Sequence, residues 1–212
     1  MRLCLVPVVG LLALPLSGAD LFTEAATVLH YRLNRRWEAS VYGRGRLNAE
    51  RGRWTDLSAA PRITCQIHPA VSVNGGMFFT SFKFGPADQT MIYRPYAAVE
   101  PELRLHPVSL KARSRIERFF ITRGLPDFTR FRQRFGLAAH VPWSPYGSFE
   151  MFFTADGFTR TRYAAGVFHR LYRRHEIEFS YYYERSRFTG QGLRHILRTV
   201  VHLHFGGPQE GD

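Results

Sequence analysis

The sequence predicts an all-β fold, a closed antiparallel transmembrane β-barrel of ten to twelve strands with a polar interior rich in arginine and glutamate. Three observations predict it: an export signal at the start, apolar–polar alternation along nearly the whole chain, and short turns alternating with longer loops. Successive side chains of a strand point to opposite faces, so alternation gives each strand one charged wall and one apolar wall. Outer-membrane barrels have this pattern, with lipid outside and a polar lumen inside.

The first 19 residues have the features of an export signal that is removed after secretion. Arg2 supplies a positive start, an apolar run covers 3–16, and small residues at 17–19 fit a cleavage site. The expected division is therefore a signal over 1–19, a barrel domain over 20–205 and a disordered polar tail over 206–212. Only Cys65 remains after cleavage, which excludes a disulfide framework within one chain. No further apolar run is long enough to predict a transmembrane helix.

The chain is strongly basic, and the basic residues are almost all arginines. The net charge is +12, and of the 29 basic residues only Lys83 and Lys111 are lysines. The arginines follow the strand-like alternation and are not collected in a tail or a recognition helix, so no nucleic-acid partner is expected. Guanidinium groups pair bidentately with carboxylates, which suits a polar barrel interior.

Eleven strand-like segments follow one another along the chain. They cover 26–33, 37–46, 54–67, 71–84, 91–105, 108–121, 127–141, 147–155, 160–169, 174–185 and 193–205. Tight connections at 34–36, 68–70, 106–107, 142–146 and 170–173 alternate with more polar, glycine-richer ones at 47–53, 85–90, 122–126, 156–159 and 186–192. This asymmetry is typical of the periplasmic and extracellular ends of an outer-membrane barrel. Because bacterial barrels usually have an even strand number, ten or twelve strands are favoured over eleven.

The closing seam and the interfacial aromatic residues can also be predicted. An open strand edge in lipid leaves backbone groups without partners, so the last segment must pair with the first. We expect segment 193–205 to pair with segment 26–33. Aromatic residues near strand ends are candidates for the membrane-interface girdle. They are Trp37, Trp54, Tyr93, Trp143 and Tyr146.

Charged side chains gather on one face of the central strands. Odd positions of segment 108–120 and even positions of segment 127–141 carry most of them, and carboxylates on one strand face guanidinium groups on a neighbour. We therefore expect a charged network that lines the lumen, held together by ion pairs and without an acid–base role. Its predicted members are Glu100, Glu102, Lys111, Arg113, Arg115, Glu117, Arg130, Arg132, Arg134, Glu150, Arg160, Arg162, Glu176 and Glu178.

Two neighbouring segments carry a family resemblance. Residues 109–120 (SLKARSRIERFF) and 128–136 (FTRFRQRFG) resemble the R-x-R-x-E-x-R-F and R-x-R core of the bacterial family called domain of unknown function 2490. The segments 162–166 and 195–205 fit the same family. The resemblance implies an outer-membrane-type barrel and no characterised activity. Its signature positions here are Arg113, Arg115, Glu117, Arg118, Phe119, Arg130, Arg132 and Arg134.

The sequence departs from the family pattern in two places. The chain continues beyond Phe205 as residues 206–212, where the last strand would be expected to end the protein. Arg118 stands where the family often has glutamine. Alternation aims Arg118 toward lipid, unless it lies near an interface.

No motif predicts catalysis or a cofactor. Nothing resembles a nucleophile elbow, a phosphate loop or a zinc signature. His202 and His204 share a face at a spacing that permits metal binding, but a pair of lumenal or turn-end histidines is the favoured interpretation. We predict no catalytic residues and no metal. A lipid-modifying enzyme would need Ser, His and an acid converging at one rim, and we expect no such group because Ser180 and His175 project to opposite faces.

The expected function is that of an outer-membrane barrel without an assigned activity. It is either a narrow pore that favours small anions or a structural barrel. Two alternatives remain open: a membrane-embedded enzyme that modifies lipid or lipopolysaccharide, and a soluble periplasmic lipocalin-like barrel with its apolar face inward. The expected partners are outer-membrane lipid and lipopolysaccharide, together with small anionic solutes.

Overall fold

The computed structural model describes residues 19–50, 52–83, 89–122, 126–172, 174–187 and 192–206. The expected export signal lies outside these residues except for Ala19, and the expected tail lies outside them except for Gly206. The loop segments 85–88 and 188–191 are likewise outside the described residues. Within the described ranges, no helix is long and apolar enough to cross a membrane.

The described residues form eleven strands, as the eleven alternating segments predicted. They are β1 (Ala19–Arg32), β2 (Trp37–Asn48), β3 (Arg53–His68), β4 (Val71–Lys83), β5 (Gln89–Leu105), β6 (Val108–Ile121), β7 (Phe128–Ala139), β8 (Trp143–Thr154), β9 (Gly157–Tyr172), β10 (His175–Ser186) and β11 (Leu193–Gly206). The preference for an even number was wrong. The largest boundary difference is in β1, which begins at Ala19 because residues 20–25 extend the first segment and do not form a strand of their own.

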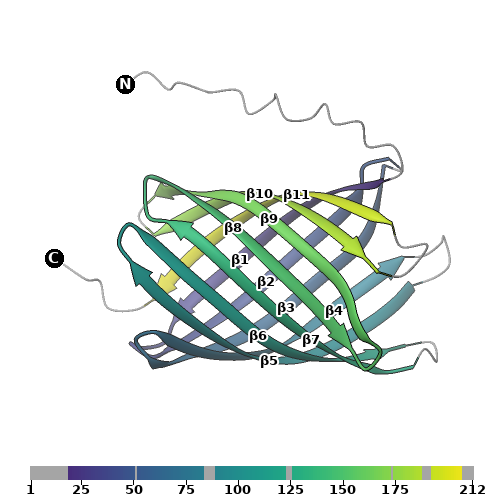
Figure 1. Ribbon diagram of the computed structural model, residues 1–212, viewed down its shortest axis with the longest axis horizontal. Coiled ribbons are helices and arrows are strands. Elements are labelled where there is room, and N and C mark those ends of the chain that lie inside the picture. Colours follow the sequence, from purple (N-terminus) through teal and green to yellow (C-terminus); the bar gives the residue numbers. More distant parts are fainter. Residues whose placement is uncertain are drawn as a thin grey trace, which may run out of the picture.

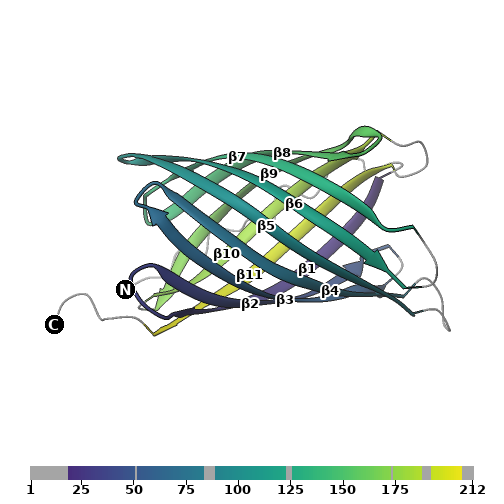
Figure 2. The ribbon, with the colours of Figure 1, turned by 90° about the horizontal axis from the view of Figure 1, so that it is seen from below.

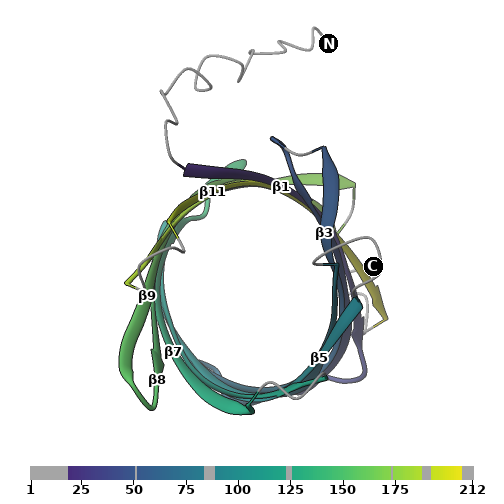
Figure 3. The same ribbon diagram turned by 90° about the vertical axis from the view of Figure 1, so that its right-hand side faces the viewer.

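The strands close into one barrel in which each is hydrogen-bonded to the next along the chain (Figures 1 and 2). Seen end-on, the ribbon forms a ring (Figure 3). The predicted seam between the first and last strands is confirmed, with Leu29 opposite Leu203 and Tyr31 opposite Phe205. The expectation of a purely antiparallel barrel is wrong, because β1 and β11 pair in parallel. With an odd number of strands in simple up-and-down order, the first and last strands necessarily run the same way.

The two ends of the barrel differ in their connections. At one end, here called the turn end, the strands are joined over 33–36, 69–70, 106–107, 140–142 and 173–174. At the other, the loop end, the connections cover 49–52, 84–88, 122–127, 155–156 and 187–192. The predicted asymmetry is present except at 155–156, a tight hairpin in which Gly157 has a φ of 93°. Ala19 lies at the loop end and Gly206 at the turn end (Figure 1).

Large apolar side chains remain exposed on the outer face of the barrel. Phe131 and Phe135 are 42% and 49% exposed, as the alternation predicted. They belong to an apolar outer surface that also includes Leu29, Val41, Leu57, Ile63, Val99, Leu103, Leu110, Ile116, Leu137 and Phe179. The buried positions, in contrast, include many charged residues. This is the reverse of the lipocalin-like arrangement, in which the apolar face would lie inside.

Four of the five predicted girdle residues are exposed near strand ends: Trp37, Trp54, Tyr93 and Trp143. The fifth assignment was wrong. The Tyr146 hydroxyl donates a hydrogen bond of 2.5 Å to Oε1 of the buried Glu178, so its ring points inward. Because β8 already begins at Trp143, Tyr146 falls on the inner face of a strand and not in a turn.

Candidate functional site

The centre of the barrel contains a buried carboxylate surrounded by arginines. Glu117 of β6 is fully buried. Arg130 Nη2 donates to its Oε2 at 2.6 Å, and Arg132 Nη1 donates to its Oε1 at 2.9 Å. Arg115 Nη1 lies 3.5 Å from the same Oε1. Strand pairing explains this arrangement, because Glu117 is directly opposite Arg130 and two positions from Arg115 on one face.

The same network continues across β8, β9 and β10. Arg132 also binds Glu150, with Nη2 at 2.9 Å from Oε1, and Arg113 Nη2 lies 2.8 Å from the same oxygen. Arg162 then joins Glu150 to Glu184, at 3.4 Å from the first and with its Nε 2.6 Å from the second. Glu184 also accepts from Arg160 at 3.1 Å. We call this set the central network: Glu117, Glu150, Glu184, Arg113, Arg115, Arg130, Arg132, Arg160 and Arg162.

An aromatic ring lies at the middle of the central network. Phe152 of β8 is 2% exposed. Four guanidinium carbons lie 4.8–5.9 Å from its ring centroid, those of Arg130, Arg132, Arg160 and Arg162. These distances are within the range of cation–π attraction, so the ring stabilises cations that would otherwise repel one another. The guanidinium carbons of Arg94 and Arg130 similarly lie 5.1 and 4.6 Å from the ring centroid of Phe119.

A second group of ion pairs lies on the strands beside the seam. Glu24 of β1 accepts hydrogen bonds from Arg44 and Arg46 at 3.3 and 3.0 Å, and Nε of Arg198 lies 3.1 Å from its Oε1 as an ion pair. Asp56 of β3 accepts from Arg44 at 2.5 Å. Arg44 and Arg46 come from β2 and Arg198 from β11, so these five residues tie both sides of the seam together. We call them the seam network.

The two networks carry more positive than negative charge. Within the described ranges, nine arginines share five carboxylates in these ion pairs. Arg94 adds a further buried guanidinium that lies against Phe78 and Phe119. The two networks therefore give this part of the interior an excess of positive charge.

A different arrangement occurs nearer the turn end. Glu178 of β10 accepts from the hydroxyls of Tyr146 and Ser180 at 2.5 and 2.8 Å, and its Oε2 is 3.5 Å from Nε2 of His202. Gly166 makes this possible, because a Cβ there would lie 2.8 Å from the Tyr146 ring and 2.6 Å from the Phe179 carbonyl oxygen. A side chain at Gly166 would displace Tyr146 from Glu178.

The expectation that no Ser, His and acid would converge was wrong. Ser180 and His175 do project to opposite faces, but a different imidazole is present: His202 of the neighbouring strand contacts Glu178, to which Ser180 is also hydrogen-bonded. The order nevertheless differs from a catalytic triad. The acid lies in the middle and the Ser180 hydroxyl donates to the carboxylate. Among the described residues, no imidazole is hydrogen-bonded to this hydroxyl, as a general base must be.

The remaining predicted site residues are not members of the central network as defined above. Glu100 accepts from Asn74 at 3.0 Å. Glu102 pairs with Arg104 and Lys111 toward the turn end, where the Lys111 side chain is 60% exposed. Arg134 is half-buried opposite Glu150 across the β7–β8 pair.

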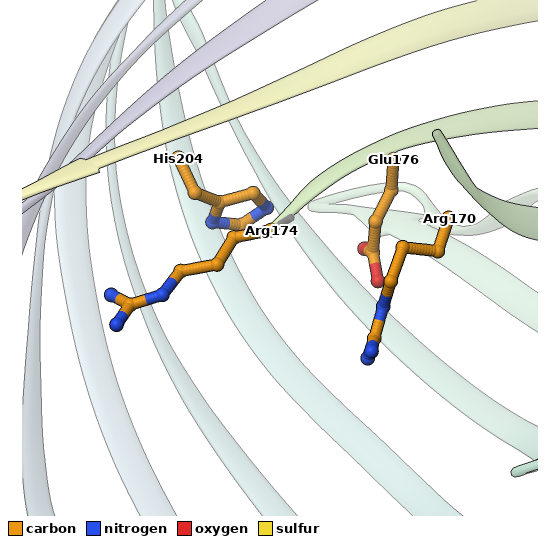
Figure 4. Close-up of a pocket in the computed structure, with 4 residues that line it drawn as sticks. All are labelled: Arg170, Arg174, Glu176 and His204. Atoms are coloured by element: carbon orange, nitrogen blue, oxygen red, sulfur yellow. The ribbon is translucent and has the colours of Figure 1, made fainter. Parts of the chain in front are cut away.

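Glu176 belongs to a shallow cavity at the turn end. The cavity has a volume of about 290 Å³ and is lined by Arg170, Arg174, Glu176 and His204 (Figure 4). The Arg174 guanidinium donates to the Gly206 carbonyl oxygen at 3.4 Å. The cavity is open to solvent and separate from the central network.

Sequence reasoning missed several interior residues. Glu24, Arg44, Arg46 and Asp56 of the seam network were not singled out, although Arg44 and Arg46 alternate with small residues in β2. Phe152 was also missed, although it lies on the same face as Glu150. The alternation of inward and outward positions along these strands is the signal that identifies the seam residues and Phe152. In the described ranges, no group of three or more His, Cys, Asp or Glu is placed to hold a metal ion.

Comparison with known proteins identifies the family of the chain. The family model described as "Protein of unknown function (DUF2490)" matches residues 25–193. This range includes the complete central network and the resemblance seen in β6 and β7. No curated protein matches the chain. Because the match covers most of the sequence and nearly all of the barrel, the chain belongs to the DUF2490 family.

Proposed function

We propose that this protein is an outer-membrane β-barrel whose lumen is closed by its central network and that favours anions in any residual conduction. The observation that carries the proposal is the excess of buried arginine over carboxylate in the middle of the barrel. Large substrates could not pass a layer in which Glu117, Phe152 and Glu184 are almost completely buried. The barrel would thus act mainly as a structural element.

Membrane insertion is supported by the distribution of side chains. The exposed apolar side chains of the outer face would give a soluble protein an unusually apolar surface in contact with water. In a membrane, lipid surrounds the same side chains favourably. The closed backbone also suits lipid, because a barrel without an edge leaves no row of unpaired backbone groups. Outer-membrane lipid and lipopolysaccharide are accordingly the proposed surroundings.

The proposal includes no catalytic step. Where Ser180, Glu178 and His202 converge, the hydroxyl is bonded to the acid and lacks an adjacent base. The lipid-modifying enzyme is therefore the less favoured function. The proposed barrel requires no cofactor.

Planar-bilayer recording tests the proposal. Purified wild-type protein should insert and show very low conductance, with a reversal potential that indicates anion preference. Replacing Phe152→Ala should raise the conductance because it removes the ring at the centre of the closed layer. Phe153→Ala, on the outer face of the same strand, should leave it unchanged. Cation preference, or a large open conductance in the wild type, would contradict the proposal.

Cell fractionation tests the location. The full-length protein should remain with the outer membrane after a high-salt and alkaline wash. Recovery of a folded monomer from the periplasm without detergent would favour the soluble barrel.

A further inference from the structure

The parallel seam brings together imidazoles from opposite ends of the sequence. His30 of β1 is directly opposite His204 of β11 in the parallel register, and His202 is one inward position away. Nε2 of His30 lies 3.3 Å from Nδ1 of His202. The His30 ring also stacks on His204, with centroids 4.3 Å apart.

Each of the two facing imidazoles has a carboxylate behind it. Nδ1 of His30 lies 2.9 Å from Oε1 of Glu38, and Nε2 of His202 lies 3.5 Å from Oε2 of Glu178. An ionised carboxylate only accepts hydrogen bonds, so the imidazole nitrogen next to it must carry the proton. In the neutral form of each ring, the other nitrogen then presents a lone pair. These are the two nitrogens that face each other.

Two facing lone pairs at this distance repel unless a cation lies between them. A shared proton or a metal ion can supply that positive charge. The 3.3 Å separation also suits two nitrogens bound to one metal ion. Two zinc–nitrogen bonds of about 2.0–2.1 Å at a tetrahedral angle place their nitrogens roughly 3.3–3.4 Å apart. A carboxylate that accepts from the second ring nitrogen is the usual support of a metal-bound histidine.

We propose that His30 and His202 form a two-nitrogen site for a divalent transition metal such as Zn²⁺, which clips β1 to β11 across the parallel seam. Glu38 and Glu178 orient the two rings, and water or a solute ligand completes the coordination. His204 stacks on His30 and shields one face of that ring. Imidazole ligands select transition metals over Mg²⁺ and Ca²⁺, which prefer oxygen.

The test is titration of the metal-free, detergent-purified full chain with Zn²⁺ alone, at pH 7.5, by calorimetry and by thermal unfolding. One ion should bind per barrel, and binding should raise the Tm because the ion joins the two strands of the seam. His30→Ala and His202→Ala should each abolish the tight binding and the rise in Tm. His106→Ala, an exposed histidine in a turn at the same end, should change neither.

Glu38→Gln provides the variant that separates metal binding from folding. It keeps both metal-binding nitrogens and the shape of the side chain, and should weaken Zn²⁺ binding by about 10–100-fold with the barrel still folded. Absence of saturable binding in the wild type would overturn the proposal and assign the 3.3 Å contact to a shared proton. Binding that is unaffected in both histidine variants would overturn it as well.

Discussion

Glu117 and Glu178 are both buried carboxylates on the inner face of the barrel, yet their neighbours differ in kind. Glu117 is paired with three arginines. Glu178 accepts hydrogen bonds from two hydroxyls and lies beside an imidazole. Arginine stays charged under all ordinary conditions, so Glu117 belongs to a permanent set of charges. Hydroxyl and imidazole groups can exchange protons and ligands, so the region around Glu178 is the one suited to respond to its surroundings.

The largest expected effect comes from removing the central carboxylate. Glu117→Ala would leave the guanidinium groups of Arg115, Arg130 and Arg132 buried near one another without the carboxylate that neutralises them. Breaking such a buried pair typically costs about 3–5 kcal/mol, and we expect a loss of that order in the free energy of unfolding. Urea unfolding in lipid vesicles, followed by tryptophan fluorescence, measures it.

Glu102→Ala is the matched control. Glu102 also pairs with two cations, but Arg104 and Lys111 are largely exposed, and such pairs contribute only about 0–1 kcal/mol. Equal losses from the two substitutions would mean that the central network does not stabilise the barrel through buried charge.

A smaller effect is expected from Phe152→Leu. The change keeps an apolar side chain but removes the aromatic face against which four guanidinium groups lie. We expect a loss of about 2–3 kcal/mol from reduced packing and lost cation–π attraction. The same change in Phe153, which packs with Phe131 on the outer face, should cost less than about 1 kcal/mol. A larger loss from Phe153→Leu would place the important aromatic packing outside the barrel.

The smallest effect is expected from Glu178→Gln. The amide oxygen can still accept from Tyr146 or Ser180, and no buried arginine loses an ion-pair partner at 4 Å or less within the described ranges. We expect a loss of roughly 1 kcal/mol, the usual value for one altered hydrogen bond. Glu117→Gln, the same chemical change, should cost several times more because three guanidinium groups lose their counter-charge. Similar losses from the two substitutions would show that Glu117 and Glu178 contribute equally to stability despite their different neighbours.

The sequence was a good guide to the strands because their signal is local. Alternation identifies a strand from its own residues, and β6 begins and ends at the predicted residues Val108 and Ile121. Whether the barrel has an odd or an even number of strands could not be predicted from local alternation. It depends on whether residues 20–25 make a separate strand or extend the first one, and both choices satisfy the alternation.

The candidate sites were predictable to the extent that their members are neighbours in one hairpin. Glu117 and Arg130 face each other across β6 and β7. The uninterrupted alternation of charged and apolar residues in both strands indicates which side chains share the inner face. The pairing of His30 with His202 depends instead on the direction of the seam strands, which lie 172 residues apart at that contact. An antiparallel seam would have brought different residues together, so the histidine group could not be read from the chain.

The parallel seam also determines where the two ends of the barrel domain emerge. β1 starts at the loop end and β11 finishes at the turn end, so Ala19 and Gly206 are on opposite faces of whatever layer surrounds the barrel. In an even-stranded barrel both would emerge on the same side. Peptide tags attached before β1 and after β11 should therefore be accessible from opposite compartments, and a domain fused to either end would be displayed on one side only.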